Sequence, residues 1–307
     1  MVLIIDGNYI LNRNVFSLNS AGVLFGSLQD SLEQSLIAIK KMYTFSDIYF
    51  VSDSAINWRK EIYQDYKVKN KKKDENIDWD FVKAAYKEFK EDLPRNVKLR
   101  ERNRVEGDDW FHTLTKRHNL RGESCLMVTN DSDIKQELHT GDDYINIIIN
   151  ENSLSNKMFV PHGYKTWLYN YRKRIGAPSL ENFDEMHKWD MIKFIKKLAE
   201  TRNVEEVNIK ESLFKKIVSG DTGDNIKSIW TRIGPKTVDV IYDKYLEYFD
   251  EEPDMSEVCI DRICDIVIEV KKLQDSDYEL LNENLKFNNK LVNFREIPPD
   301  IIELMNI

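Results

Sequence analysis

Five short, mostly apolar runs limit what this chain can fold into more than any other feature. They occupy residues 2–5, 47–51, 97–99, 125–129 and 144–149. Runs this short and this apolar are typical of strands that are buried on both faces of a sheet. Helical patterns separate them, such as the spacing of Leu28, Leu32 and Leu36 and a pattern that begins near Glu106. The alternation predicts an α/β fold with a twisted, mostly parallel sheet and helices on both of its faces.

The second half of the chain has a different pattern. From residue 209 onward the sequence predicts only helices, over 209–218, 235–248, 256–273, 277–286 and 299–305. We therefore expect an α/β domain over residues 1–160 and an all-helical domain over 206–307. Residues 161–205 carry the basic run Arg172-Lys173-Arg174 and show no clear strand pattern. They are expected to be an insertion or a connecting segment, whose basic run either contacts DNA or a partner or is simply solvated.

Composition excludes several classes of protein. The formal net charge is −8, and the three cysteines include no CxxC pair, so neither a disulfide framework nor a zinc site is expected. No apolar run approaches the ~18 residues of a membrane-spanning helix. The N-terminal sequence MVLIIDGN lacks the basic segment of a signal peptide. These features predict a cytoplasmic protein without membrane association.

The acidic total conceals an uneven distribution of charge. Between Arg59 and Lys73 there are seven basic residues and two acids, and a second basic stretch runs from Arg95 to Arg104. A single charge run is most simply a solvated surface. Two such runs on either side of a predicted helix favour a surface that contacts phosphate groups.

Carboxylates follow three of the predicted strands at the point where each strand ends. Asp6 follows the first strand, Asp53 follows the second, and Asp131 and Asp133 follow the fourth. Each acid alone could cap a turn or a helix. Because the carboxyl ends of parallel strands meet at one edge of a sheet, we expect these four side chains to share a site.

Two further groups of acids fit the same site. Glu106, Asp108 and Asp109 begin a predicted helix, and Asp221 and Asp224 lie three residues apart in a later loop. No Cys or His cluster accompanies these acids, so an oxygen-only ligand set is expected, which suits Mg²⁺ or Mn²⁺. Two such ions can stabilise the attacking and leaving oxygens of a phosphoryl displacement. Beside basic stretches, this chemistry fits a phosphodiester hydrolase, and a nucleotidyl transferase also fits.

As an ordered set, these motifs resemble the flap endonuclease/5′-nuclease family. The matching motifs are Asp6-Gly7-Asn8, Ser52-Asp53, Trp58-Arg59-Lys60, Tyr66-Lys67, Glu106-Gly107-Asp108-Asp109, Thr129-Asn130-Asp131-Ser132-Asp133 and Gly220-Asp221-Thr222-Gly223-Asp224-Asn225. The stretch Ile233-Gly234-Pro235-Lys236-Thr237 resembles the helix-hairpin-helix of that family. Within the family, the chain resembles the ribonuclease H of T-even-type phages.

This resemblance implies a PIN-like domain, with a basic arch near residues 67–94, and a helical domain that carries a helix-three-turn-helix. The implied activity is Mg²⁺-dependent 5′→3′ exonuclease and flap endonuclease action, with ribonuclease H activity, which removes RNA primers and flaps during DNA replication. The implied substrates are DNA and RNA–DNA hybrids with 5′ ends, flaps or forks. A sliding clamp or a single-strand-binding protein is a candidate partner, and we expect a monomer.

The resemblance also implies roles for individual residues. The first of two Mg²⁺ ions, which Mn²⁺ can replace, would be held by Asp6, Asp53, Glu106 and Asp108, with Asp109 in the same cluster. The second ion would be held by Asp131, Asp133, Asp221 and Asp224. Lys67 would stabilise charge on the scissile phosphate. The DNA contacts would come from Arg59, Lys60, Tyr66, Lys67, Lys69, Lys71, Arg232, Gly234, Lys236 and Thr237.

Two positions depart from the family pattern. Arg232 replaces the usual glycine of the hairpin, and Asn70 replaces the usual arginine after the Tyr-Lys motif. Two other functions stay open at this point. One is a non-catalytic, junction-binding accessory protein of replication, and the other is a PIN-type ribonuclease that acts on structured RNA.

Overall fold

The chain forms two compact units. The computed structural model describes residues 1–68, 76–151, 156–176 and 183–305. Unit 1 comprises Met1–Ala55 and Lys71–Val207, and unit 2 comprises Ile56–Asn70 and Asn208–Ile307. The short segment 56–70 therefore belongs to the second unit, although the expected α/β domain spans residues 1–160.

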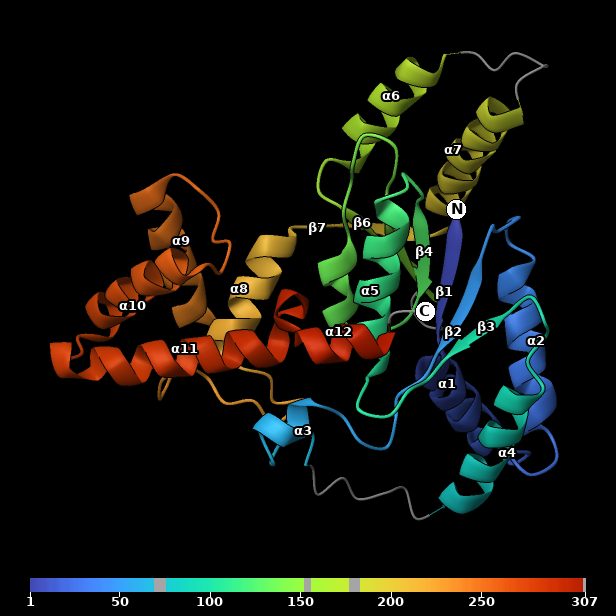
Figure 1. Cartoon of the computed structure of the whole chain (residues 1–307), viewed down its shortest axis with the longest axis horizontal. Helices are drawn as coiled ribbons and strands as arrows, with labels where there is room; N and C mark the ends of the chain where they lie inside the picture. The colour runs from blue at the N-terminus through green and yellow to red at the C-terminus, as the bar shows by residue number, and fades with distance from the viewer. Residues whose placement is uncertain (69–75, 152–155, 177–182, 306–307) are drawn as a thin grey trace. The chain divides into compact units, whose positions relative to one another are not determined.

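A seven-stranded sheet forms the centre of unit 1, with the order β3-β2-β1-β4-β5-β6-β7 (Figure 1). The strands are β1 (Val2–Asp6), β2 (Ile48–Val51), β3 (Lys98–Arg100), β4 (Cys125–Val128), β5 (Ile147–Glu151), β6 (Asn156–Pro161) and β7 (Asn203–Val207). The first five strands pair in parallel, β6 is antiparallel to β5, and β7 is parallel to β6. The predicted mostly parallel sheet is confirmed.

Helices cover both faces of this sheet. They are α1 (Gly7–Ser20), α2 (Leu28–Lys40), α4 (Trp79–Glu91), α5 (Gly107–Asn119), α6 (Tyr164–Ile175) and α7 (Phe183–Thr201). Leu3 and Ile5 of β1 share one core with side chains of every one of these helices except α5. Val2 and Ile4 alternate with them, are equally buried, and point to the other face, where α5 packs on β1.

Residues 161–205 are part of unit 1 where they are described. They contain α6, α7 and most of β7, whose Val204 pairs with Met158 of β6. The sequence of β7, NVEEV, shows no clear strand pattern because an edge strand tolerates polar, partly exposed side chains. Helix α1 was also not predicted, because it is rich in asparagine, which has a low helix propensity.

Unit 2 is helical. It contains α3 (Arg59–Ile62), α8 (Ile209–Ser219), α9 (Pro235–Phe249), α10 (Glu257–Lys271), α11 (Tyr278–Val292) and α12 (Pro299–Met305). The five helices predicted after residue 208 are all present, and the apolar faces of α8, α9, α10 and α11 form one core that also includes Tyr66. Arg59 Nε donates a hydrogen bond to the carbonyl of Leu291 at 2.9 Å, which attaches the segment 56–70 to α11. Among the described helices of both units, none is long and apolar enough to cross a membrane.

Candidate functional site

Asp6 lies at the end of β1, at the carboxyl edge of the parallel strands. Its Oδ1 accepts the backbone N–H of Tyr9 at 2.9 Å and so caps α1. Its Oδ2 accepts the hydroxyl of Thr129 at 2.7 Å, and Thr129 follows β4, the neighbour of β1 in the sheet. The pKa of Asp6 is raised to about 6, mainly by burial and to a smaller extent by the nearby charges of Asp53 and Asp131, while the two hydrogen bonds oppose the rise. Three acids that the sequence assigned to one site are thus close in the structure.

Asp53 connects the end of β2 to the beginning of α5. Its Oδ1 accepts the backbone N–H of Gly107, the first residue of α5, at 2.7 Å, and the amide of Asn8 donates to its Oδ2. A Cβ atom on Gly107 would lie only 3.1 Å from Asp53 Oδ1. The glycine therefore lets this carboxylate approach the positive end of a helix dipole.

The three acids at the start of α5 have different environments. Glu106 and Asp109 form a capping box, in which Asp109 Oδ2 accepts the backbone N–H of Glu106 at 3.0 Å. Both side chains are buried, and Asp109 has no exposed surface. Asp108 lies in the first turn and is partly exposed. The position of Asp109 favours a structural role, whereas Asp108 is accessible to a ligand.

The loop after β4 places Asp131 and Asp133. The backbone N–H of Asp131 donates to Thr129 Oγ1 at 3.0 Å, and that of Asp133 donates to Asp131 Oδ1 at 2.9 Å. Thr129 thereby orients both Asp6 and the Asp131 loop. Unit 1 as a whole gathers the predicted acids at the carboxyl edge of the sheet, from β1, β2, β4 and the start of α5.

The remaining two acids, Asp221 and Asp224, lie in a loop of unit 2. Tyr66 and Lys67, from the segment 56–70 of the same unit, contact this loop. The hydroxyl of Tyr66 donates to Asp224 Oδ2 at 3.0 Å, and the backbone N–H of Lys67 donates to the carbonyl of Asp224 at 2.9 Å. Burial raises the pKa of Asp224, and the charge of Lys67 opposes this rise. The predicted Tyr-Lys motif is therefore placed against Asp224 by hydrogen bonds within unit 2.

Asp221, in the same loop, has a different environment. Lys216 Nζ lies 2.7 Å from its carboxylate. Burial would raise the pKa of Asp221, but the hydrogen bond and the charge of Lys216 outweigh this effect and lower it. Asp221 is consequently ionised more readily than its neighbour Asp224.

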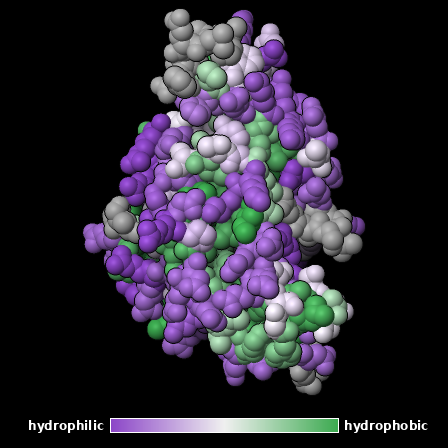
Figure 2. Space-filling model, turned by 90° about the vertical axis from the view of Figure 1, so that its right-hand side faces the viewer, coloured by the Kyte–Doolittle hydropathy of each residue, from purple (hydrophilic) through white to green (hydrophobic). Residues whose placement is uncertain are grey.

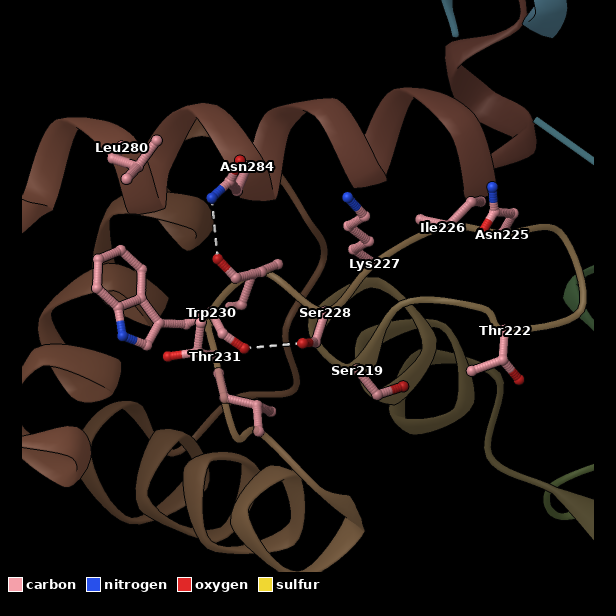
Figure 3. Close-up of a pocket in the computed structure, with 12 residues that line it drawn as sticks. Ser219, Thr222, Asn225, Ile226, Lys227, Ser228, Trp230, Thr231, Leu280 and Asn284 are labelled. Atoms are coloured by element: carbon pink, nitrogen blue, oxygen red, sulfur yellow. Dashed lines mark hydrogen bonds between the residues drawn. The ribbon is translucent and has the colours of Figure 1, made fainter. Parts of the chain in front are cut away.

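This loop also forms a pocket of about 660 Å³ against α11 (Figure 3). Ser228 Oγ donates to the carbonyl of Trp230 at 2.7 Å, and Asn284 Nδ2 of α11 donates to the carbonyl of Ile229 at 3.0 Å. The ring of Trp230 and the exposed Leu280 provide apolar walls, and Lys227 also lines the pocket. Sequence reasoning did not single out these residues. The only local signal was a tryptophan in a loop otherwise rich in polar residues.

The predicted DNA-binding residues of segment 56–70 differ in exposure. Lys60 is exposed, and Lys67 is partly exposed, with its ammonium group 5.2 Å from the centre of the Tyr66 ring. Arg59 is only 2% exposed, and its guanidinium lies 4.4 Å from the centre of the Trp58 ring. Tyr66 is buried as well. Lys69 and Lys71, like Asn70, lie outside the described residues.

The hairpin before α9 leads into the N-terminus of that helix. Arg232 has a φ of 58°, in the left-handed region that favours glycine, which accounts for the family's usual residue there. Gly234 is the N-cap of α9, and Pro235 occupies the first helical position. Lys236 is exposed and Thr237 partly exposed in the first turn. Backbone N–H groups at a helix N-terminus bind phosphate without reading sequence.

Comparison with known proteins assigns this arrangement to a family. A family model described as the 5′-3′ exonuclease N-terminal resolvase-like domain matches residues 1–163, more than half of the chain. The chain belongs to this 5′-3′ exonuclease family. The predictions that it is a nuclease of the 5′-nuclease family and that its fold is PIN-like are confirmed. No curated protein sequence matches the chain.

Solved structures of bacteriophage T5 proteins share the fold of this exonuclease family member. The T5 5′-exonuclease with bound zinc ions has a TM-score of 0.58 at 14% identity, over 99% of this chain and 96% of that one. A T5 flap endonuclease in complex with DNA and metal ions has a TM-score of 0.55 at 15% identity, over 99% and 95%. A T5 protein co-crystallised with metal ions has a TM-score of 0.56 at 15% identity, over 99% and 96%. At this level of identity the similarity concerns the fold.

Proposed function

We propose that this chain is a Mg²⁺-dependent, structure-specific 5′ nuclease that hydrolyses phosphodiester bonds at the carboxyl edge of its sheet. The observation that carries the proposal is the convergence of Asp6, Asp53 and Asp131 from three strand ends. Hydrogen bonds from Thr129 and from the N-terminus of α5 hold two of these carboxylates in place. A packed scaffold that fixes several anions at one edge is suited to binding cations and, through them, a phosphate.

The donor set fits hard divalent cations. The gathered side chains offer carboxylate oxygens, which suit Mg²⁺ or Mn²⁺. Burial chiefly raises the pKa of Asp6, and the charges of Asp53 and Asp131 add to the rise, so a bound cation would stabilise its ionised form. When bound, two such ions would neutralise charge on the phosphate and activate water for attack. We assign Asp6, Asp53, Glu106 and Asp108 to the first ion.

For the second ion, Asp131 and Asp133 of unit 1 and Asp221 and Asp224 of unit 2 remain the predicted ligands. Lys67 is the predicted contact to the scissile phosphate. The T5 flap endonuclease of similar fold was solved with DNA and metal ions, which supports this chemistry for the chain studied here.

The proposed substrates are DNA and RNA–DNA hybrids with 5′ ends, flaps or forks. The exposed first turn of α9 supports contact with duplex phosphates, because it places the ammonium group of Lys236 near the positive end of the helix dipole. Removal of RNA primers and flaps during replication follows from such substrates. A monomer is expected, and a sliding clamp or a single-strand-binding protein is a proposed partner.

Cleavage assays on a panel of 5′-labelled substrates test the proposal. The panel contains a recessed duplex, a flap, an RNA-primed duplex and a structured RNA, each with and without Mg²⁺. Asp53→Asn and Asp131→Asn should each lower the cleavage rate by at least about 100-fold, since they remove a metal-binding charge. Glu33→Gln, an exposed carboxylate on α2, is the matched control and should cleave normally.

Each other outcome has a clear meaning. Normal turnover in either aspartate variant would refute the site assignment. Cleavage that needs no divalent metal would refute the proposed chemistry. Cleavage of structured RNA alone would identify a PIN-type ribonuclease instead.

A further inference from the structure

Helices α6 and α7 carry a concentration of positive charge that the nuclease chemistry does not use. The sequence of α6 contains four basic residues and no acid. The sequence of α7 contains four lysines, Lys188, Lys193, Lys196 and Lys197, and four acids, so the excess of positive charge comes from α6. Together the two helices carry eight basic residues and four acids, in a chain whose formal net charge is −8.

The outer face of α6 combines cations with an exposed aromatic ring. Lys165, Tyr169, Arg172 and Lys173 are all exposed and share one side of the helix at helical spacing. Tyr169 is 68% exposed, whereas Tyr171 on the inner side is only 2% exposed. The hydroxyphenyl ring of Tyr169 is therefore presented to solvent between positive charges.

Arg172 joins this face to α7. Its guanidinium lies 5.3 Å from the centre of the Trp189 ring, and Trp189 Nε1 donates to the carbonyl of Gly176 at 2.7 Å. Lys193 lies one helical turn beyond Trp189. We call the joint surface of Lys165, Tyr169, Arg172, Lys173, Trp189 and Lys193 the α6–α7 basic surface.

The α6–α7 basic surface lies away from the gathered carboxylates. Strand β5 is parallel to β4 and β1, and β6 is antiparallel to β5. The last residues of β6, which lead into α6, therefore lie at the edge of the sheet where β1 begins, opposite the edge that carries the acids. Tyr171 and His187 line one pocket together with Met1 and Ser124, which stand at the starts of β1 and β4. Figure 1 shows α6 and α7 extending beyond the start of β1, and hydrophilic side chains cover much of the face drawn in Figure 2.

We propose that the α6–α7 basic surface binds a single-stranded segment of nucleic acid outside the cleavage site. Cations spread along an exposed helix face, here Lys165, Arg172 and Lys173, suit the phosphates of an extended strand, and their binding releases counterions. Exposed aromatic rings next to cations are the usual stacking platform for unpaired bases, and they accept any base. This contact extends the substrate beyond the proposed nuclease site and does not depend on metal or on cleavage.

Binding of a labelled 30-nucleotide oligothymidine, measured by fluorescence anisotropy in EDTA at several salt concentrations, tests the proposal. The triple variant Lys165→Gln/Lys173→Gln/Lys193→Gln should bind at least about tenfold more weakly, with a salt slope lower by about 2. The matched control Lys41→Gln/Lys116→Gln/Arg121→Gln removes three exposed charges elsewhere on unit 1 and should keep the normal slope.

A second pair of variants tests the aromatic contribution. Tyr169→Ala should bind the oligothymidine about fivefold more weakly or worse, because it loses a stacking surface. Tyr169→Phe should bind normally. If the triple variant fails to fold, equal oligothymidine affinities for Tyr169→Ala and Tyr169→Phe would overturn the proposal by themselves.

Equal affinities and salt slopes for the triple variant and its control would overturn the proposal and indicate an acidic protein partner instead. Failure of the nuclease assignment would be distinguishable, because it appears in the cleavage assays and leaves this metal-free binding unchanged.

Discussion

The hydroxyl of Thr129 lies 2.7 Å from Asp6 Oδ2 and joins the carboxyl ends of two adjacent strands, β4 and β1. The same Thr129 oxygen accepts the backbone N–H of Asp131 at 3.0 Å. One neutral side chain thus orients two of the acids to which we assign metal binding. It also stabilises the ionised form of Asp6, whose pKa is already raised to about 6.

Replacement of this threonine should change how metal binding depends on pH. Thr129→Val removes the donor to Asp6, so the pKa of Asp6 should rise further above about 6. Protons then compete better with the metal, and Mn²⁺ affinity at pH 6 should fall by roughly tenfold, with little change at pH 8. Calorimetric titration with Mn²⁺ at pH 6, 7 and 8 measures this. Thr129→Ser keeps the hydroxyl and should behave as wild type, and an identical pH dependence in the valine variant would contradict the expectation.

Asp109 and Asp108 should respond differently to the same substitution. Asp109 is buried and accepts the backbone N–H of Glu106, so Asp109→Ala should lower the free energy of unfolding by about 1–2 kcal/mol. Asp109→Asn can still accept this bond and should retain most of the Mn²⁺ affinity. Asp108→Asn should lose Mn²⁺ affinity at nearly unchanged stability. Urea unfolding and calorimetry measure the two effects, and a reversed pattern would make Asp109 the ligand.

Arg59 and Lys60 are neighbours on α3 with opposite expected roles. Arg59 is buried and donates to the carbonyl of Leu291, so Arg59→Ala should lower the free energy of unfolding by about 2 kcal/mol or more. Lys60 is exposed, so Lys60→Ala should change stability by less than about 0.5 kcal/mol. Its expected effect is weaker binding of a flap substrate at low salt. Thermal unfolding measures the stability of the two variants, and fluorescence anisotropy measures their binding of the flap substrate. If Arg59→Ala instead keeps normal stability and binds the flap more weakly, Arg59 contacts DNA and the expectation is wrong.

Glu137 should make stability depend on pH. Burial alone would raise the pKa of Glu137. The hydrogen bond with His112 Nδ1, which lies 2.8 Å from the carboxylate, the charge of His112 and the hydrogen bond from the Thr115 hydroxyl outweigh burial and lower this pKa below its usual value. A lowered pKa in the folded state means that this stabilisation is complete above the pKa of the unfolded chain and is lost as pH falls through the folded value. Urea unfolding at pH 7, 5 and 4 should show a smaller acid-induced loss of stability in Glu137→Gln than in wild type. An equal loss in both proteins would show that another group dominates.

The parallel part of the sheet and its acids could be predicted because their signals are local. A continuous apolar run such as residues 125–128 must be covered on both faces, and the acid that follows a parallel strand must lie at its carboxyl edge. Strand β7 could not be predicted in this way. Its polar sequence becomes a strand only because β6 offers it an unpaired edge.

Exposure was harder to predict than position. Arg59 belongs to a basic run, and a basic run normally lies on the surface. The carbonyl of Leu291, more than two hundred residues away in the chain, and the ring of Trp58 allow it to be buried. The spacing of Glu106 and Asp109 allowed both metal binding and capping, and only the packing of α5 shows Asp109 as a buried cap.

The sequence by itself determined the α/β and helical halves, the family motifs and the acids at the strand ends, because these depend on residue spacing along single elements. The tertiary structure alone decided that residues 56–70 belong to unit 2, that Thr129 joins Asp6 to the Asp131 loop, and that Arg172 and Trp189 unite α6 and α7 into one surface. These outcomes depend on partners distant in the chain. Burial and hydrogen bonding with such partners are set by the packing of whole elements, which no local pattern encodes.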